Sequence, residues 1–135
     1  MSSMGEPPLL LGVDAVTVPA SDLDAGLAFY HGLLGHRLLW RNDAVGQAGL
    51  ALAAHETELV LTTTAPYAPT WLVSSVDSAL DTIVHAGGRV VRGASPVPVG
   101  RLAVAEDVFG NHLVLLDTSV GRYLTDESGR VTGVE

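Results

Sequence analysis

The spacing of apolar residues changes twice along the first half of the chain. Apolar and polar residues alternate across residues 11–19, which predicts a strand. Apolar positions then recur every three or four residues from 22 to 34, a helical period, with Ser21 placed to cap the helix and Gly35 to end it. Alternation returns afterwards and predicts three strands, at residues 36–41, 45–53 and 57–64.

The second half repeats this order of elements. A predicted strand over residues 70–76 precedes a helix that Asp77 caps and that runs to about residue 85. Three further strands are predicted at residues 89–92, 97–106 and 112–117. The repeat predicts an α+β fold of two tandem βαβββ modules. Within one domain spanning 9–117, module one covers 9–64 and module two covers 70–117.

The two ends of the chain fall outside the modules. Residues 1–8 are mostly small or polar and end in two prolines, which disfavours a helix and predicts a disordered N-terminus. Residues 118–135 alternate around Asp126-Glu127-Ser128-Gly129, a sequence suited to a turn with glycine at positive φ. We expect a short C-terminal hairpin, packed as an extension of the domain or at a subunit contact.

Composition narrows the class of protein. Of the 135 residues, 47% are hydrophobic and 16% are charged, which is enough for a packed core. No apolar run approaches the ~18 residues of a membrane span, and the first residues do not resemble a secretion signal, so we expect a cytoplasmic protein with no membrane contact. The formal charge is −8 and the seven basic residues are dispersed arginines, which argues against nucleic-acid binding. The absence of cysteine excludes disulfides and thiolate chemistry.

Short motifs give the chain a family resemblance. They are Val16–Asp24, Phe29–Tyr30 followed by Leu33–Gly35, and Asp107–Asn111 before an apolar strand. Over about residues 9–117 the chain resembles the vicinal oxygen chelate superfamily, which includes glyoxalase I, ring-cleaving dioxygenases, fosfomycin-resistance enzymes and bleomycin-binding proteins. The resemblance implies a curved mixed sheet around a concave cavity, and a homodimer. One fold hosts many chemistries, so the site must decide the function.

The resemblance also implies where metal ligands would lie. In relatives that use a metal, the ligands fall on four positions, here Ala15, Glu58, Thr70 and Val114. Only Glu58 is a strong ligand, and catalytic divalent ions take about three protein ligands. We therefore expect no metal and no cofactor. The alternative is a site rebuilt with His112, which by strand alternation shares the face of Val114.

Glu58 and His112 each have two interpretations. Glu58 is either a carboxylate on a solvated strand or a cavity-facing acid that binds a cationic or hydroxyl-bearing ligand. His112 either faces solvent beside its turn or meets Glu58, in which case the pair act as general base and orienting acid. Trp40, Tyr67 and Tyr123 suit either a ligand pocket or a dimer seam.

Three functions follow from these residues. The preferred one is a metal-independent small-molecule-binding protein, similar to the bleomycin-binding resistance proteins, which sequesters a drug-like or metabolite ligand in the concave sheet; the acidic surface favours a basic ligand. The predicted ligand-binding residues are Ala15, Thr17, Trp40, Glu58, Thr70, Leu72, His112 and Val114. The alternative is a lyase or isomerase of the glyoxalase type that uses Glu58 and His112 for proton transfer, or a displaced metal site. The third is a partner-binding module with a filled cavity and an exposed apolar patch.

Overall fold

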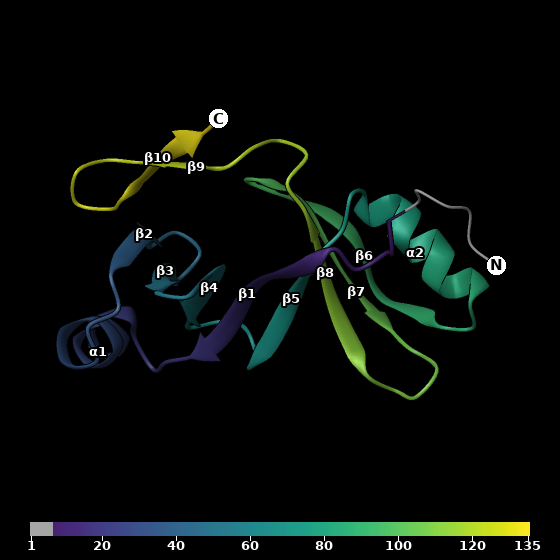
Figure 1. Ribbon diagram of the computed structural model, residues 1–135, viewed down its shortest axis with the longest axis horizontal. Coiled ribbons are helices and arrows are strands. Elements are labelled where there is room, and N and C mark those ends of the chain that lie inside the picture. Colours follow the sequence, from purple (N-terminus) through teal and green to yellow (C-terminus); the bar gives the residue numbers. More distant parts are fainter. Residues whose placement is uncertain (1–6) are drawn as a thin grey trace.

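An eight-stranded mixed sheet forms the body of the molecule and is curved (Figure 1). Residues from strands of both halves line a cavity. The computed structural model describes residues 7–135, so most of the segment 1–8, predicted to be disordered, lies outside the described residues. The strand order is β2-β3-β4-β1-β5-β8-β7-β6, and β9 and β10 form a separate two-stranded sheet. This architecture confirms the predicted α+β class with a curved sheet and a short C-terminal hairpin.

Each half of the chain contributes four strands to the large sheet. The first half supplies β1 (Gly12–Pro19), β2 (Leu38–Asn42), β3 (Gln47–Leu52) and β4 (His55–Thr62). The second half supplies β5 (Ala68–Leu72), β6 (Arg89–Val97), β7 (Gly100–Glu106) and β8 (His112–Asp117). Two boundaries differ most from the predicted ones. Strand β6 continues to Val97 because it pairs with β7 as one long hairpin, and β5 ends at Leu72 because the chain turns there into the next helix.

The helix of module one is short and changes type along its length. It begins as α1 (Leu23–Leu27) and continues as a π-helical segment, η1 (Ala28–Leu33). The predicted cap, Ser21, is wrong by one residue. Asp22 is the cap, since its Oδ1 accepts the Ala25 N–H at 2.7 Å. Gly35 ends the helix with φ +84°, as predicted.

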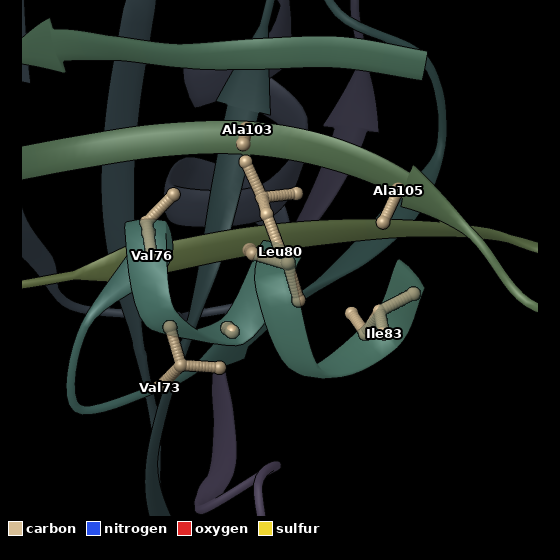
Figure 2. Close-up of a cluster of buried hydrophobic side chains, with 8 residues drawn as sticks. Val73, Val76, Leu80, Ile83, Ala103 and Ala105 are labelled. Atoms are coloured by element: carbon tan, nitrogen blue, oxygen red, sulfur yellow. The ribbon is translucent and has the colours of Figure 1, made fainter. Parts of the chain in front are cut away.

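The helix of module two, α2 (Val76–His85), has a larger buried face. Ser75 caps it, because its Oγ accepts the Ser78 N–H at 3.3 Å; the predicted cap, Asp77, lies in the first turn, where a negative charge favours the helix dipole. Figure 2 shows the helix packed against β7, with Leu80 and Ile83 toward the strand's alanines. Among residues 7–135, no helix is long and apolar enough to cross a membrane.

The two modules meet where β1 pairs with β5. This pair is antiparallel and brings Ala15 opposite Thr70. On either side, β1 pairs in parallel with β4, and β5 pairs in parallel with β8. The modules therefore repeat the same pairing about this junction, which is why residues equivalent in the repeat become neighbours in the sheet.

The sheet of module one packs on both faces. On one face, Ala48, Leu50 and Leu61 of the sheet pack with Leu23 of α1 in a buried cluster. Toward the cavity, Ala15, Trp40 and Val60 form a second buried cluster, against which Tyr123 and Val131 pack. Those two residues belong to the C-terminal hairpin of β9 (Tyr123–Thr125) and β10 (Val131–Val134). The hairpin lies over β2 on the side away from α1 (Figure 1).

A buried carboxylate joins the end of β8 to the start of α2. Asp117 is 3% exposed; its Oδ2 accepts the Val76 N–H at 2.9 Å and its Oδ1 accepts the Arg101 N–H at 3.1 Å. Burial alone would raise the pKa of Asp117, but the hydrogen bonds from Val76, Ser119 and Arg101 outweigh it and hold the pKa below its ordinary value. The ionised carboxylate is therefore part of the packing of module two.

Candidate functional site

Four residues form a row across the centre of the sheet. Glu58 on β4 is the register partner of Ala15 on β1, Ala15 is the partner of Thr70 on β5, and Thr70 is the partner of Val114 on β8. These are the four positions that the family resemblance assigns to metal ligands. The row crosses the junction of the two modules, at the centre of the concave face.

A cavity of about 1120 Å³ lies over this row. Seven of the eight residues predicted to bind a ligand line it, namely Ala15, Thr17, Trp40, Glu58, Thr70, His112 and Val114. Leu72 does not. It lies on a smaller neighbouring cavity of about 660 Å³. Strand β5 keeps a regular register with β8 through Leu72, and the smaller cavity is lined by Asp14, Glu58 and Arg122 as well.

Glu58 is the carboxylate of the row, and one of its oxygens is already engaged. The Trp40 Nε1–H donates to Glu58 Oε1 at 2.6 Å. Burial raises the pKa of the Glu58 carboxyl above its ordinary value, the hydrogen bond from Trp40 opposes this, and nearby Asp14 raises the pKa further. Of the two interpretations of Glu58, the geometry supports the cavity-facing acid.

Gly49 allows the indole to reach Glu58. It is the register partner of Trp40, and Val60 on β4 is the next partner along. A Cβ at position 49 would overlap Nε1 and the neighbouring ring carbons of Trp40. Because glycine has no side chain, the indole lies across β3 and its N–H meets the carboxylate on β4.

His112 lines the cavity but is directed to a different acid. Its Nε2 lies 3.4 Å from Glu106 Oε2, an oxygen that Arg89 also contacts at 2.6 Å. The His112 side chain is 58% exposed. The hydrogen bonds of residues 7–135 include none between His112 and Glu58, so the predicted pair of base and orienting acid is not formed here. Alternation along the strand correctly predicted that His112 lies on the cavity face. Its ring, however, contacts Glu106, the residue opposite it on β7.

The donor set of the row does not fit a catalytic metal ion. Ala15 offers a methyl group, Val114 an isopropyl group and Thr70 a neutral hydroxyl, and only Glu58 supplies a carboxylate. Nowhere in the part of the chain that the structure describes do three or more His, Asp or Glu side chains gather as such a site requires. His112 does not add a second ligand beside Glu58, because its ring contacts Glu106.

Among the cavity-lining residues that the predicted site did not include, three are polar or aromatic side chains near Glu58 and Trp40. Asp14, Arg122 and Tyr123 all line the cavity. Asp14 precedes Ala15, so simple alternation would direct it to the opposite face; the irregularity between Val13 and Ala15 changes that. Tyr123 was one of three aromatic residues suited to a pocket, but its position over Trp40, with ring centroids 5.0 Å apart, depends on how the hairpin folds back.

The turn Asp107–Asn111, part of the motif that carries the family resemblance, is held by its own hydrogen bonds and has a structural role. Asp107 Oδ1 accepts the backbone N–H groups of Phe109 and Asn111, and Asp107 Oδ2 accepts the Asn111 side chain at 2.9 Å. The bonds from Asn111 are the main reason why the pKa of Asp107 lies below its ordinary value. Gly110 supplies the positive φ of +91°.

Comparisons with known proteins identify the family and support the fold. The model of the Glyoxalase/Bleomycin resistance protein/Dioxygenase superfamily matches residues 12–115. Among solved structures, methylmalonyl-CoA epimerase from Mycobacterium tuberculosis is similar, with a TM-score of 0.64 and 23% identity over 84% of this chain and 92% of that chain.

Two further solved structures share the fold. A methylmalonyl-CoA epimerase variant from Streptomyces coelicolor, in complex with 2-nitronate-propionyl-CoA, has a TM-score of 0.64 and 20% identity over 82% of this chain and 99% of that chain. A hypothetical protein from Bacillus halodurans has a TM-score of 0.62 and 16% identity over 78% and 93%. No curated protein matches the sequence. At these identities the structural likeness establishes the fold alone.

Proposed function

Because the chain belongs to the Glyoxalase/Bleomycin resistance protein/Dioxygenase superfamily, we propose that it is a metal-independent protein that binds a basic small molecule in the concave cavity. The observation that carries this proposal is the row of Glu58, Ala15, Thr70 and Val114. One carboxylate among apolar and hydroxyl side chains suits an organic ligand with a single cationic group better than it suits a divalent ion.

The size of the cavity and the acidity of the chain support such a ligand. The volume of about 1120 Å³ lies slightly above the ~300–1,000 Å³ usual for small-molecule pockets. Two acids, Glu58 and Asp14, and two arginines, Arg92 and Arg122, lie on the cavity wall, so the attraction of a ligand ammonium group comes from Glu58 itself and from the net charge of −8 on the chain. The ammonium group can donate to Glu58.

Charge-matched probes test this proposal. Benzylammonium, benzyl alcohol and phenylacetate share an aromatic body but differ in charge, and their binding can be measured by calorimetry. We expect benzylammonium to bind about tenfold more tightly than the alcohol, and phenylacetate to bind least, because a charge-assisted hydrogen bond forms only with the cation. Glu58→Gln should remove most of this preference, whereas Glu56→Gln, which changes the net charge equally on the same strand, should keep it. Equal binding of the three probes would contradict the proposal.

Metal independence is tested separately. Protein purified without an affinity metal is examined by elemental analysis and then titrated with nickel, zinc, manganese and iron(II) while thermal stability is followed. We expect less than one ion per chain and no saturable rise in stability. One retained ion per chain would overturn this part of the proposal.

A proton-transfer enzyme is the second candidate, and the raised pKa of Glu58 favours it. A carboxyl whose pKa is raised by burial in a cavity can act as a general base. Since His112 lies beside Glu106, Glu58 would act without it. Incorporation of solvent deuterium into methylmalonyl-CoA, the ligand named for a structural neighbour, would support this candidate if Glu58→Gln abolished it.

The predicted homodimer also remains a proposal. Strands β2 and β6 are the two edges of the large sheet; the C-terminal hairpin bridges β2 at Arg41, so β6 is the edge better placed to join a second chain. Sedimentation equilibrium across a range of concentrations checks it, and a single mass near 14.0 kDa would contradict it.

A further inference from the structure

The C-terminal segment lies beyond the family match yet forms part of the cavity. The match ends at residue 115, whereas Arg122, Tyr123 and Thr125 all line the cavity. In Figure 1 the hairpin runs over β2 at the top of the molecule. This wall is therefore an addition to the repeat, and it covers one module only.

Three contacts of different kinds hold the hairpin against module one. At its turn, the Arg41 N–H of β2 donates to Gly129 O at 2.7 Å. At its base, Arg122 Nη1 lies 3.4 Å from Asp14 Oδ1. Between them the Tyr123 ring packs on Trp40, with centroids 5.0 Å apart and planes inclined at 49°. The Arg122 side chain is 65% exposed, so its ion pair is a weak attachment.

The aromatic contact fixes the group that binds Glu58. The Trp40 indole lies over Gly49 and packs against Tyr123, and Trp40 is 9% exposed. Its N–H occupies Glu58 Oε1. In the hydrogen bonds of residues 7–135, Glu58 Oε2 has no protein donor and is left for a ligand.

We propose that Tyr123 is a positioning residue: by closing over Trp40, the C-terminal hairpin orients the indole that holds Glu58 Oε1, so that Oε2 faces a ligand ammonium group. The proposal rests on the proposed function for the identity of the ligand, but the closure itself depends only on the hairpin. Without Tyr123, the indole is free to rotate and the carboxylate loses its fixed donor. The hairpin thereby adds selectivity to a cavity in which Glu58 is the carboxylate of the central row.

The chain offers a built-in reporter for this closure. It contains two tryptophans. Trp71 packs in the core beneath α2, so Trp71→Phe leaves Trp40 as the single tryptophan. In that background, acrylamide quenching measures access to the indole without any ligand. We expect little quenching in the parent and several-fold stronger quenching in Tyr123→Ala. Tyr123→Phe, which keeps the ring, should behave as the parent.

Leu124 supplies the matched control. It is on the same strand, is 42% exposed and does not line the cavity. Leu124→Ala should leave the quenching of Trp40 unchanged, because it removes a similar apolar side chain without touching the indole. Equal quenching in the parent and Tyr123→Ala, or equal increases in Tyr123→Ala and Leu124→Ala, would overturn the proposal.

Binding measurements on the same variants distinguish the positioning role of Tyr123 from the proposed function. Tyr123→Ala should bind benzylammonium about fivefold less tightly and should lose preference for it over benzyl alcohol, whereas Leu124→Ala should not. If Glu58→Gln weakens binding and Tyr123→Ala does not, the proposed function stands and the positioning role is wrong. If the parent binds none of the probes, the proposed function fails, and the quenching of Trp40 alone decides whether the hairpin holds the indole.

Discussion

The two modules share one topology but differ in what they bury. In module two, α2 buries Val76, Ala79, Leu80 and Ile83 against the sheet. In module one, α1 buries only Leu23 and Gly26, and η1 buries no residue. Module one instead packs a second cluster on the cavity side, with Trp40 and the hairpin. The repeat thus concentrates helix packing in module two, whereas module one supplies the carboxylate of the row, Glu58, and its tryptophan donor.

Two carboxylates, the buried Asp117 and the half-buried Glu58, show a related difference. Asp117 in module two is satisfied by backbone N–H groups and its pKa is lowered, so its charge supports the fold. Glu58 in module one has a raised pKa, mainly through burial, so its charge opposes the fold. A group that costs stability where it lies is a stronger candidate for function than one that contributes stability.

The largest expected effect is on Asp117. Asp117→Ala leaves the buried Val76 and Arg101 N–H groups without their acceptor, and we expect a loss of about 3–4 kcal/mol in the free energy of unfolding, measured with urea. Because the folded pKa is lowered, the contribution of Asp117 is present above the unfolded pKa of ~3.9 and is lost as pH falls through the folded value. The difference between the two proteins should therefore shrink in acid. A constant difference from neutral pH into strong acid would contradict the role of the charge.

Truncating the two helices should give a smaller but unequal pair of effects. Leu80→Ala in α2 removes a side chain that is 9% exposed, and we expect a cost of about 2–3 kcal/mol. Leu27→Ala in α1 removes a half-buried side chain and should cost about 1 kcal/mol. Urea unfolding of both variants measures the difference. Equal costs would remove the distinction between the modules.

The smallest expected effect has the opposite sign. Glu58→Gln should stabilise the protein by about 0.5 kcal/mol at pH 7.5, since the amide keeps an acceptor for Trp40 and removes a buried charge. The folded pKa of Glu58 is raised, so its cost is absent below the unfolded pKa of ~4.3, grows as pH rises toward the folded value, and is constant above it. The gain should therefore vanish near pH 4, as followed by thermal unfolding. A loss of stability at pH 7.5 would show that Glu58 supports the fold.

The period of the apolar residues was sufficient to predict the repeat, because strands and helices bury one face each. The four positions Glu58, Ala15, Thr70 and Val114 came from the family resemblance instead, and in the structure they are register partners on β4, β1, β5 and β8. The predictions made from alternation hold where the strands are regular.

The predictions that were wrong concern residues where the alternation of a strand breaks, or contacts between residues far apart in the sequence. The irregularity at Asp14 directs that residue to the cavity. Leu72 lines the smaller neighbouring cavity instead, a division of the concave face that no local pattern predicts. The partner of His112 depends on the pairing of β7 with β8, which brings Glu106 opposite it. The observed helix caps are Asp22 and Ser75 and not the predicted residues, because more than one side chain at each helix start can accept a backbone N–H bond. The fold of the hairpin over Trp40 requires tertiary packing that no local pattern contains.

The closure of the hairpin has a practical consequence for handling the protein. The backbone of Glu135 pairs with that of Arg122 through two bonds of 2.9 Å, and Arg122 lines the cavity. A polyhistidine tag joined after Glu135 would therefore extend from the rim of the site, where its imidazoles would bring metal ligands close to Glu58. Leu9 and Leu10 pack against the core of module two, so a tag on the N-terminal side keeps purification chemistry apart from the metal measurements.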